Sequence, residues 1–173
     1  MDCIITTATN ADREVLADMF MAHITAHREY ISHGEMQMGT AVMVTAEDGS
    51  RSPAPAPDGR RMWIKYITEK ISSEDAVVYK AVSGEEIVGF CVADIEEDGA
   101  APFGMLCDVL VKENVRGGGI GSALMAAGLG WLRSKGITDI YLESGKNNHS
   151  AHGFFERRGF RKVSEIFRLD NQD

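Results

Sequence analysis

The sequence has no hydrophobic run long enough to cross a membrane and few residues that could crosslink the chain. No window approaches the roughly 18–20 consecutive apolar residues of a membrane span, and the first residues lack the basic and apolar segments of a secretion signal. The three cysteines, Cys3, Cys91 and Cys107, are odd in number and widely spaced. We therefore expect reduced thiols in a cytoplasmic protein, with no disulfide framework and no zinc site.

Positive charge is also scarce, with 18 lysines and arginines against 26 aspartates and glutamates, a formal net charge of −8. This balance argues against a general nucleic-acid binder, which would need cations to neutralise phosphates. An acidic surface attracts cations and so suits a cationic amine substrate. Solubility alone would explain the same charge, and both interpretations stay open.

Prolines are few, and three of the four lie close together at Pro53, Pro55 and Pro57. We predict an exposed, partly extended loop at about residues 46–60, either a mobile lid over a substrate or a tolerated surface insertion. It is not expected to be a domain boundary, because the residues before it are too few to fold alone. With 173 residues, 44% of them apolar, the chain is predicted to form a single domain over residues 1–173.

The hydrophobic pattern predicts an alternation of strands and helices in the order β-α-α-β-β-β-α-β-α-β. The expected strands lie at about 3–7, 76–82, 87–95, 105–111, 137–142 and 160–169, and the expected helices at about 15–24, 63–71, 120–132 and 150–158. A turn at 83–86 would join two strands as a hairpin. The predicted fold class is α/β (α+β), with a mixed, mostly antiparallel central sheet flanked by helices.

The clearest local feature is a glycine cluster, Arg116-Gly117-Gly118-Gly119-Ile120-Gly121-Ser122, between a strand and a helix. Glycines let backbone N–H groups approach a ligand, and the first turn of a helix offers unpaired N–H groups at the positive end of its dipole. Arg116 adds a fixed positive charge and Ser122 adds a hydroxyl. The cluster therefore predicts a cradle for an anion, most naturally a diphosphate.

Two common phosphate-binding motifs do not fit the cluster. A P-loop needs a lysine directly after its last glycine, and none follows these glycines at that offset. A dinucleotide fingerprint needs a final glycine where Ser122 or Leu124 stands, and Glu143 is the one feature in its favour. The hairpin-linked strands before the cluster also cannot form two mononucleotide-binding halves.

Arg116 to Gly121 matches the pyrophosphate signature of the GNAT superfamily of N-acetyltransferases, Arg/Gln-x-x-Gly-x-Gly/Ala, residue for residue. Upstream, residues 107–111 look like the family's fourth strand. Downstream, residues 148–160 resemble its Asn-x-x-Ala-x-x-Phe/Leu-Tyr-x-x-x-Gly-Phe motif. The resemblance covers about residues 105–160 and implies a GNAT-like acyl-CoA N-acyltransferase fold with acetyl-CoA (coenzyme A) as cosubstrate and no metal.

The resemblance also implies where acetyl-CoA binds. The fourth strand would offer backbone groups to the pantetheine arm and the thioester, the glycine cluster would hold the diphosphate, and Asn148 would both cap its helix and contact pantetheine. The residues expected at acetyl-CoA are Val109, Leu110, Val111, Arg116, Gly117, Gly118, Gly119, Ile120, Gly121, Ser122, Asn148, Ala151 and Phe155.

In the mechanism that the resemblance implies, a deprotonated amine attacks the thioester directly and a backbone N–H near Val109 stabilises the oxyanion. Asp108 is the first candidate for the base or for an ammonium anchor, with Glu35 and Glu143 as alternatives. The preceding family position is frequently glutamate and is Cys107 here. Strand alternation would point Asp108 away from the face shared by Cys107 and Val109.

Phe155 stands where many family members carry the tyrosine that reprotonates the departing thiolate, and phenylalanine has no proton to donate. Water, Ser144 or a histidine could supply that proton. The substitution keeps a second hypothesis open, a non-catalytic module that binds and senses acyl-CoA. Small-molecule and peptide amines both remain candidate substrates, and an alanine-rich helix and an exposed strand edge are compatible with a homodimer.

Overall fold

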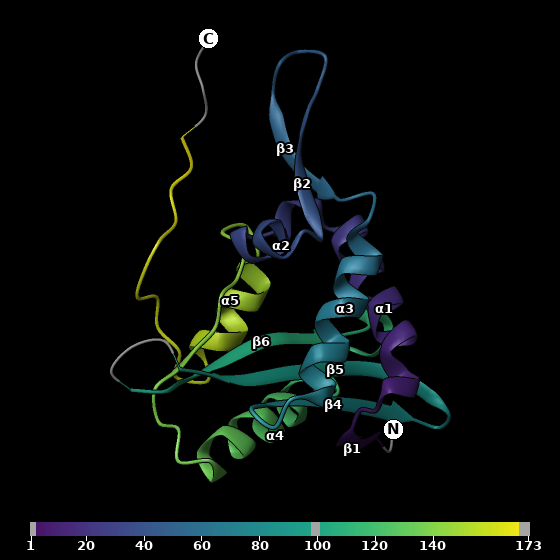
Figure 1. Cartoon of the computed structure of the whole chain (residues 1–173), viewed down its shortest axis with the longest axis vertical. Helices are drawn as coiled ribbons and strands as arrows, with labels where there is room; N and C mark the ends of the chain where they lie inside the picture. Colours follow the sequence, from purple (N-terminus) through teal and green to yellow (C-terminus); the bar gives the residue numbers. More distant parts are fainter. Residues whose placement is uncertain (1–2, 98–100, 170–173) are drawn as a thin grey trace.

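A five-stranded sheet forms the centre of the protein in the computed structural model, which describes residues 3–97 and 101–169 (Figure 1). In spatial order its strands are β1 (Cys3–Thr7), β4 (Ala76–Ser83), β5 (Glu86–Glu96), β6 (Phe103–Val111) and β7 (Ile140–Tyr141). Neighbouring strands are antiparallel except β6 and β7, which are parallel. The predicted fold class, a mostly antiparallel mixed sheet flanked by helices, is confirmed.

Helices cover both faces of the sheet (Figure 1). Helices α1 (Arg13–Ala26) and α3 (Gly59–Ser72) pack on one face, where Leu16, Phe20 and Trp63 are buried with residues of β4 and β5. Helix α4 (Ile120–Ser134) packs on the other face through Leu124 and Leu132, and side chains of α5 (His149–Glu156) join that core. Their apolar spacing buries one stripe of each helix.

Short 3-10 helices mark three of the connections: η1 (Asn10–Asp12), η2 (Arg28–Tyr30) and η3 (Glu113–Val115). The Asp12 carboxylate accepts a hydrogen bond from the Thr9 N–H at 2.7 Å and so fixes the chain just before α1. No helix among residues 3–97 and 101–169 has both the length and the apolar character needed to span a membrane.

The Pro-rich stretch is more ordered than the sequence predicted. Within the loop predicted at about 46–60, residues Arg51–Pro55 form strand β3, which pairs with β2 (Ala41–Thr45) in a hairpin that protrudes from the body (Figure 1). Helix α2 (His33–Met38) precedes this hairpin. Prolines normally argue against a strand because they donate no ladder hydrogen bond. In a two-stranded sheet each strand has only one neighbour, so Pro53 and Pro55 can occupy β3 without breaking the pairing.

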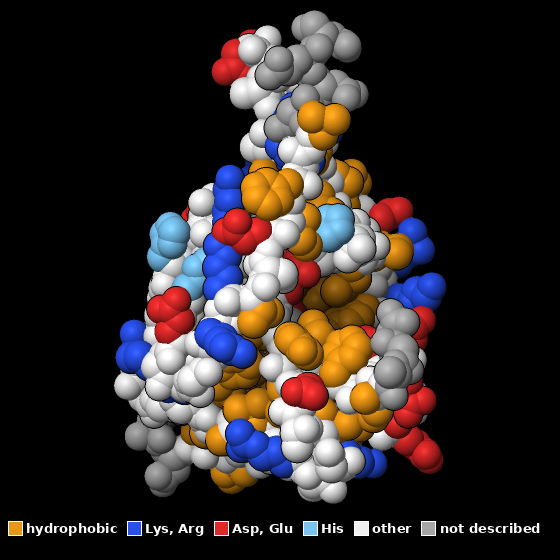
Figure 2. Space-filling model, turned by 90° about the vertical axis from the view of Figure 1, so that its left-hand side faces the viewer, with side chains coloured by type: hydrophobic (Ala, Val, Ile, Leu, Met, Phe, Trp, Pro, Cys, Tyr) orange, Lys and Arg blue, Asp and Glu red, His pale blue; other side chains and the backbone are white. Residues whose placement is uncertain are grey.

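The C-terminal end is less ordered than predicted. Residues 161–169 form no strand, and the segment runs along the outside of the body with Val163, Ile166, Phe167 and Leu169 at least 61% exposed. Figure 2 faces this side and shows hydrophobic side chains at the surface. The predicted strand at 137–142 is reduced to Ile140–Tyr141. A strand needs a partner along its length, and β7 pairs with β6 at only two positions.

Candidate acetyl-transfer site

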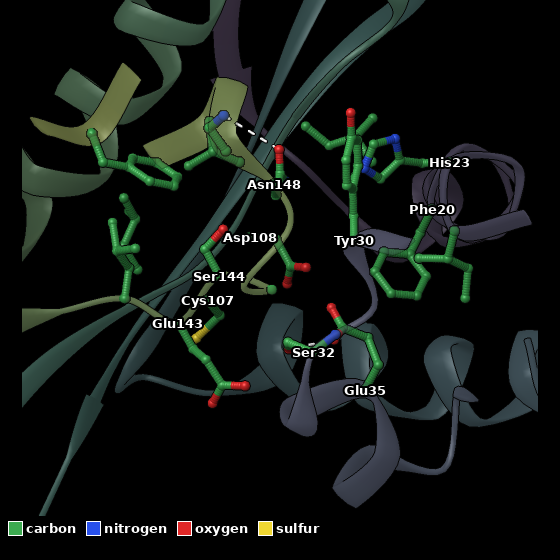
Figure 3. Close-up of a pocket in the computed structure, with 18 residues that line it drawn as sticks. Phe20, His23, Tyr30, Ser32, Glu35, Cys107, Asp108, Glu143, Ser144 and Asn148 are labelled. Atoms are coloured by element: carbon green, nitrogen blue, oxygen red, sulfur yellow. Dashed lines mark hydrogen bonds between the residues drawn. The ribbon is translucent and has the colours of Figure 1, made fainter. Parts of the chain in front are cut away.

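A cavity of about 110 Å³ lies where β6 and the chain after β7 separate. The two strands pair only at Gly104 with Ile140 and at Met105 with Tyr141. Beyond these pairs the cavity is lined by β6, by the segment after β7 with α5, and by α1, η2 and α2 (Figure 3). The lining includes Phe20, His23, Tyr30, Ser32, Glu35, Cys107, Asp108, Val109, Leu110, Glu143, Ser144, Asn148, Ala151 and Phe155.

A β-bulge in β6 sets the direction of two side chains at this cavity. Val92 pairs with Asp108 and Ala93 pairs with Leu106, so Cys107 is the extra residue. A bulge breaks the strict alternation of side chains along a strand. Cys107 and Asp108 therefore both face α1 and α3, and the expectation that they point to opposite faces is wrong. Val109 does lie on the opposite side, against the α4 core.

Asp108 has an environment suited to proton exchange. Figure 3 shows its carboxylate among the lining residues, between Ser144 and Asn148 on one side and Phe20 and Tyr30 on the other. Its Oδ2 accepts a hydrogen bond of 2.9 Å from the Tyr66 hydroxyl. Burial, reinforced by the charge of Glu35, raises the pKa of Asp108 to about 7, against the opposing effects of Tyr66 and Lys70. Both protonation states are therefore populated near neutral pH.

The two alternative carboxylates are both held by the start of α2. Glu35 accepts a 2.7 Å hydrogen bond from the backbone N–H of Ser32 and another from the Ser32 hydroxyl. The first of these, with the Ser32 side chain accepting from the Glu35 N–H in return, makes a capping box. Glu143 accepts a 2.9 Å hydrogen bond from the N–H of Gly34. Three carboxylates thus line one small cavity, which favours a positively charged guest.

The glycine cluster forms an open, exposed turn before α4. Gly117 and Gly119 have φ angles of +86° and +81°, a region that favours glycine, and an added Cβ at either would meet no atom within 4 Å. Arg116 bends back to donate from Nε to the Val111 carbonyl at 3.0 Å. Residues 116–119 are exposed, whereas Ile120 is buried under the start of the helix.

A second arginine at this turn was not predicted from the sequence. Arg158 donates to the hydroxyl of Ser122 and lies over the ring of Phe154, 3.6 Å from its centroid. Ser122, expected as a phosphate donor, thus accepts a hydrogen bond in this structure. Arg158 lies inside the second motif, two residues before Phe160, which is the signal that could have identified it.

The edge of β6 that faces away from β5 offers free backbone groups. The Lys112 N–H donates to the Val88 carbonyl on β5, whereas the Val111 carbonyl accepts from Arg116 on the other side. Because backbone groups alternate along a strand, those of Val109 also point away from β5, and those of Leu110 point toward it. The N–H of Val109 is therefore on the edge where β6 and β7 separate.

The start of α5 completes the cavity. The Asn148 side chain accepts a 3.3 Å hydrogen bond from the Ala151 N–H, which confirms its predicted role as N-cap. Asn148, Ala151, Phe155 and Ser144 all line the cavity. The aromatic ring of Phe155 packs against Phe154 and Phe160.

His23 of α1 and Tyr30 of η2, which form one wall of the cavity, were not identified from the sequence. The ring of Tyr30 stacks on His27, with ring centroids 4.8 Å apart, and lies tilted against His23 at 6.1 Å. Burial, with the nearby His27 and Arg116, lowers the pKa of His23 to about 4, so it is neutral at neutral pH. His27 lies 2.5 Å from Glu113 and links this wall to the turn before the glycine cluster. His23 and His27, one helical turn apart, were the only sequence signal.

Among residues 3–97 and 101–169 no group of three or more His, Cys, Asp and Glu side chains is arranged to hold a metal ion. The three cysteines are free, and Cys91 is buried.

Comparisons with known proteins agree with this geometry. N-alpha-acetyltransferase 30 of Schizosaccharomyces pombe is 27% identical over 92 residues, 52% of this chain and 61% of that protein. Aminoglycoside N(6')-acetyltransferase type 1 of Stenotrophomonas maltophilia is 25% identical over 109 residues, 60% of this chain and 71% of that protein. The chain thus matches less than two thirds of the length of the first of these relatives.

Solved structures share the fold. An acetyltransferase from Clostridium acetobutylicum, solved with acetyl-CoA, superposes with a TM-score of 0.72 at 14% identity, covering 98% of this chain and 96% of that one. At this identity the likeness concerns the fold alone. The model of the acetyltransferase (GNAT) family matches residues 43–160, which include β6, the glycine cluster and α5. The chain belongs to the GNAT family of acetyltransferases.

Proposed function

We propose that this protein transfers the acetyl group of acetyl-CoA to a primary amine by direct attack in a ternary complex. The observation that carries the proposal is the placement of Asp108. This carboxylate lies in the cavity where β6 and β7 separate, with a pKa raised to about 7, and the same strand leads to the glycine turn. A base for the amine and a cradle for the cosubstrate are thus separated by only seven residues of chain, 109–115.

The glycine turn fits the diphosphate of acetyl-CoA. No side chain lies within 4 Å of the position an added Cβ would take at Gly117, Gly118 or Gly119, at the start of a helix, which is a favourable place for an anion. Arg116 and Arg158 supply two positive charges at the same turn. The backbone of Val109, on the free edge of β6, would pair with the pantetheine arm and the thioester. The Clostridium acetobutylicum structure with acetyl-CoA supports this choice of cosubstrate.

In the proposed reaction Asp108 takes a proton from the bound ammonium, directly or through water, and the neutral nitrogen forms a bond to the thioester carbonyl carbon. An alkylamine with pKa near 10.4 is almost wholly protonated at pH 7, and removing its proton costs about 4–5 kcal/mol. The Val109 N–H would stabilise the negative charge on the carbonyl oxygen. The carbon–sulfur bond then breaks, and the nitrogen loses its second proton, which passes through Ser144 or water to the departing thiolate. The products are the N-acetyl amine and coenzyme A.

We further propose that the amine is a small cationic molecule and not a peptide N-terminus. Glu35, Asp108 and Glu143 surround a cavity of only about 110 Å³, so charge is concentrated in little space. The aminoglycoside N(6')-acetyltransferase among the relatives acts on such a molecule, as its name states. The N-alpha-acetyltransferase 30 among the relatives favours the competing hypothesis, in which the substrate is the N-terminal amine of a peptide.

A second candidate function is a module of the same fold that binds acyl-CoA without turnover. Phe155 favours it, because this ring lines the cavity and cannot donate a proton to the leaving thiolate. A thiol with pKa near 8.5 is a fair leaving group even without a dedicated acid. The two functions therefore differ in whether bound acetyl-CoA is consumed when an amine is present.

The test measures coenzyme A thiol release from acetyl-CoA with aminoglycosides, polyamines and N-terminal peptides, for wild type and Asp108→Asn. We expect turnover with at least one small polycation, and a loss of about 10²–10⁴-fold in the variant, as for removal of a general base. Calorimetry should give the same acetyl-CoA affinity for both proteins. Binding without release for any amine would favour the sensing module, and undiminished release in Asp108→Asn would rule out the proposed base.

A further inference from the structure

A largely buried polar cluster connects Asp108, at the cavity, to helix α3 and strand β5. It comprises Tyr66 and Lys70 of α3, Asp94 of β5, and Cys107 and Asp108 of β6. Tyr66 donates to Asp108 at 2.9 Å, the Cys107 thiol lies 3.5 Å from an oxygen of Asp94, and Lys70 forms an ion pair with Asp94. These contacts join the bulge in β6 to one face of α3.

The ion pair in this cluster is unusual in its burial. The side chain of Asp94 is 5% exposed and that of Lys70 is 22% exposed. Removing two charges from water is costly, and a buried pair is often no more stabilising than apolar residues of the same size. Stability alone is thus a poor reason for placing this pair directly below the bulge.

The arrangement of α3 suggests a more specific role. Tyr66 and Lys70 are four residues apart and therefore lie on the same face of the helix. The ammonium of Lys70 is 5.6 Å from the centre of the Tyr66 ring. Asp94 binds Lys70 on one side and the thiol of the bulged Cys107 on the other. The pair therefore holds both the helix that carries Tyr66 and the bulge that turns Asp108 toward it.

We propose that Tyr66, supported by the Lys70–Asp94 ion pair, is a positioning residue that fixes the orientation and the charge state of the Asp108 carboxylate. The Tyr66 hydroxyl engages Oδ2 and leaves Oδ1 for the amine. This inference rests on the proposed role of Asp108 as the base. Neither Tyr66 nor the ion pair touches the substrate in this assignment, because only Cys107 and Asp108 of the cluster line the cavity.

The charge of Asp108 is set by groups on every element packed around it. The Tyr66 hydrogen bond and the Lys70 charge lower the pKa of Asp108, whereas burial and the charge of Glu35 raise it. Burial, reinforced by the charge of this carboxylate, raises the pKa of the Tyr66 hydroxyl and of the thiols of Cys91 and Cys107. The titratable groups involved are Glu35 of α2, Tyr66 and Lys70 of α3, Cys91 and Asp94 of β5, and Cys107 of β6, with His23 of α1 and Glu143 also lining the cavity.

The experiment follows the protonation of Asp108 itself, with no amine needed. Carboxyl carbons of aspartate-labelled protein are titrated by NMR, and the Asp108 signal is identified by its absence in Asp108→Asn. We expect a midpoint near pH 7 in wild type and a higher midpoint in Tyr66→Phe, which removes only the hydroxyl. Glu35→Gln should move the midpoint the other way. An unchanged or lower midpoint in Tyr66→Phe would overturn the proposal.

A matched control is Tyr79→Phe, because Tyr79 packs on the α4 side of the sheet, away from Asp108. It should leave the midpoint as in wild type. The ion pair is tested by the double variant Lys70→Met with Asp94→Asn, which should also raise the midpoint, and an unchanged midpoint there would remove the pair from the proposal. If Tyr66→Phe shifts the midpoint but no amine is acetylated, the positioning contact stands and the proposed function fails.

Discussion

Two parts of the candidate site are built in different ways. Beyond the end of β6, Arg116 to Ser122 are contiguous in sequence, and most of the turn is exposed. In the cavity beside β6, Asp108 meets Tyr66 from 42 positions away, and Glu143 reaches Gly34 across 109 positions. One site is a stretch of backbone, whereas the other is an assembly of five separate segments.

This difference determines how each site tolerates change. The glycine turn needs particular φ angles and free space at Gly117 and Gly119, so it is sensitive to substitution at those two glycines. The site at Asp108 depends on how closely α1, α2 and the segment after β7 approach one another. A substitution that separates those segments should damage the cavity and leave the turn intact.

The largest effect is expected from Gly145→Ala. Gly145 packs so closely on η2 that an added Cβ would lie 2.1 Å from the carbonyl oxygen of Tyr30. The backbone must move apart, because neither atom belongs to a flexible side chain. We expect a loss of about 2–4 kcal/mol in the free energy of unfolding. We also expect a higher KM for the amine, with a smaller effect on acetyl-CoA affinity. Urea unfolding measures the stability, amine-dependent kinetics give the KM, and calorimetry gives the acetyl-CoA affinity.

Gly130→Ala is the matched control for that substitution. It lies in α4 where an added Cβ meets no atom within 4 Å. Alanine is the better helix former, so this variant should gain about 0.5–1 kcal/mol. Equal stability of the two variants would contradict the close packing of Gly145 on η2.

A smaller and more selective effect is expected from Gly119→Val. Valine is strained at a φ of +81° and would place a side chain in the open cradle. Acetyl-CoA affinity should fall by about 10–100-fold, while the titration of Asp108 stays unchanged. Calorimetry measures the first and NMR the second.

Gly118→Ala provides the comparison for the glycine turn. Its added Cβ would meet only the Val115 carbonyl, at 3.8 Å, and its φ does not require glycine. Near-normal affinity in Gly118→Ala with a loss in Gly119→Val would assign the effect to the Gly119 position. If neither variant loses acetyl-CoA affinity, acetyl-CoA does not bind at the glycine turn.

Much of the fold could be predicted because each helix buries one apolar face and the central strands are largely apolar runs. The predicted helix at 120–132 and the hairpin through Gly84 correspond to α4 and to the β4–β5 pair. The β2–β3 hairpin was missed because Pro53 and Pro55 are usually absent from strands. The C-terminal segment has the alternation of a strand but lacks a partner edge among the described residues, and alternation alone cannot reveal that.

The site was predictable to the extent that it is local. Arg116 to Gly121 and Asn148 were found from their own neighbours in sequence, and their backbone geometry agrees with the expectation. Asp108 was named, but its direction was wrong, because a single extra residue at Cys107 changes the face and no pattern in β6 reveals it. Tyr66 carries no local signal, since an aromatic residue on an amphipathic helix fits any core.

The smallest expected effect links the base to the stability of the fold. The pKa of Asp108 is raised from its ordinary 3.8 to about 7, so the folded state binds this proton more tightly than the unfolded state. The stabilising contribution is therefore fully present below about pH 4 and is lost as pH rises through 7. Above that pH the folded protein holds a half-buried carboxylate charge.

Asp108→Asn has no such charge, so its stability relative to wild type should grow between pH 4 and 8, by on the order of 1–2 kcal/mol after solvent screening. Urea unfolding at several pH values measures this difference. Parallel pH curves for the two proteins would show that the carboxylate carries no such cost, whereas the expected divergence, together with lost turnover, would mark Asp108 as a residue kept for function at the expense of stability.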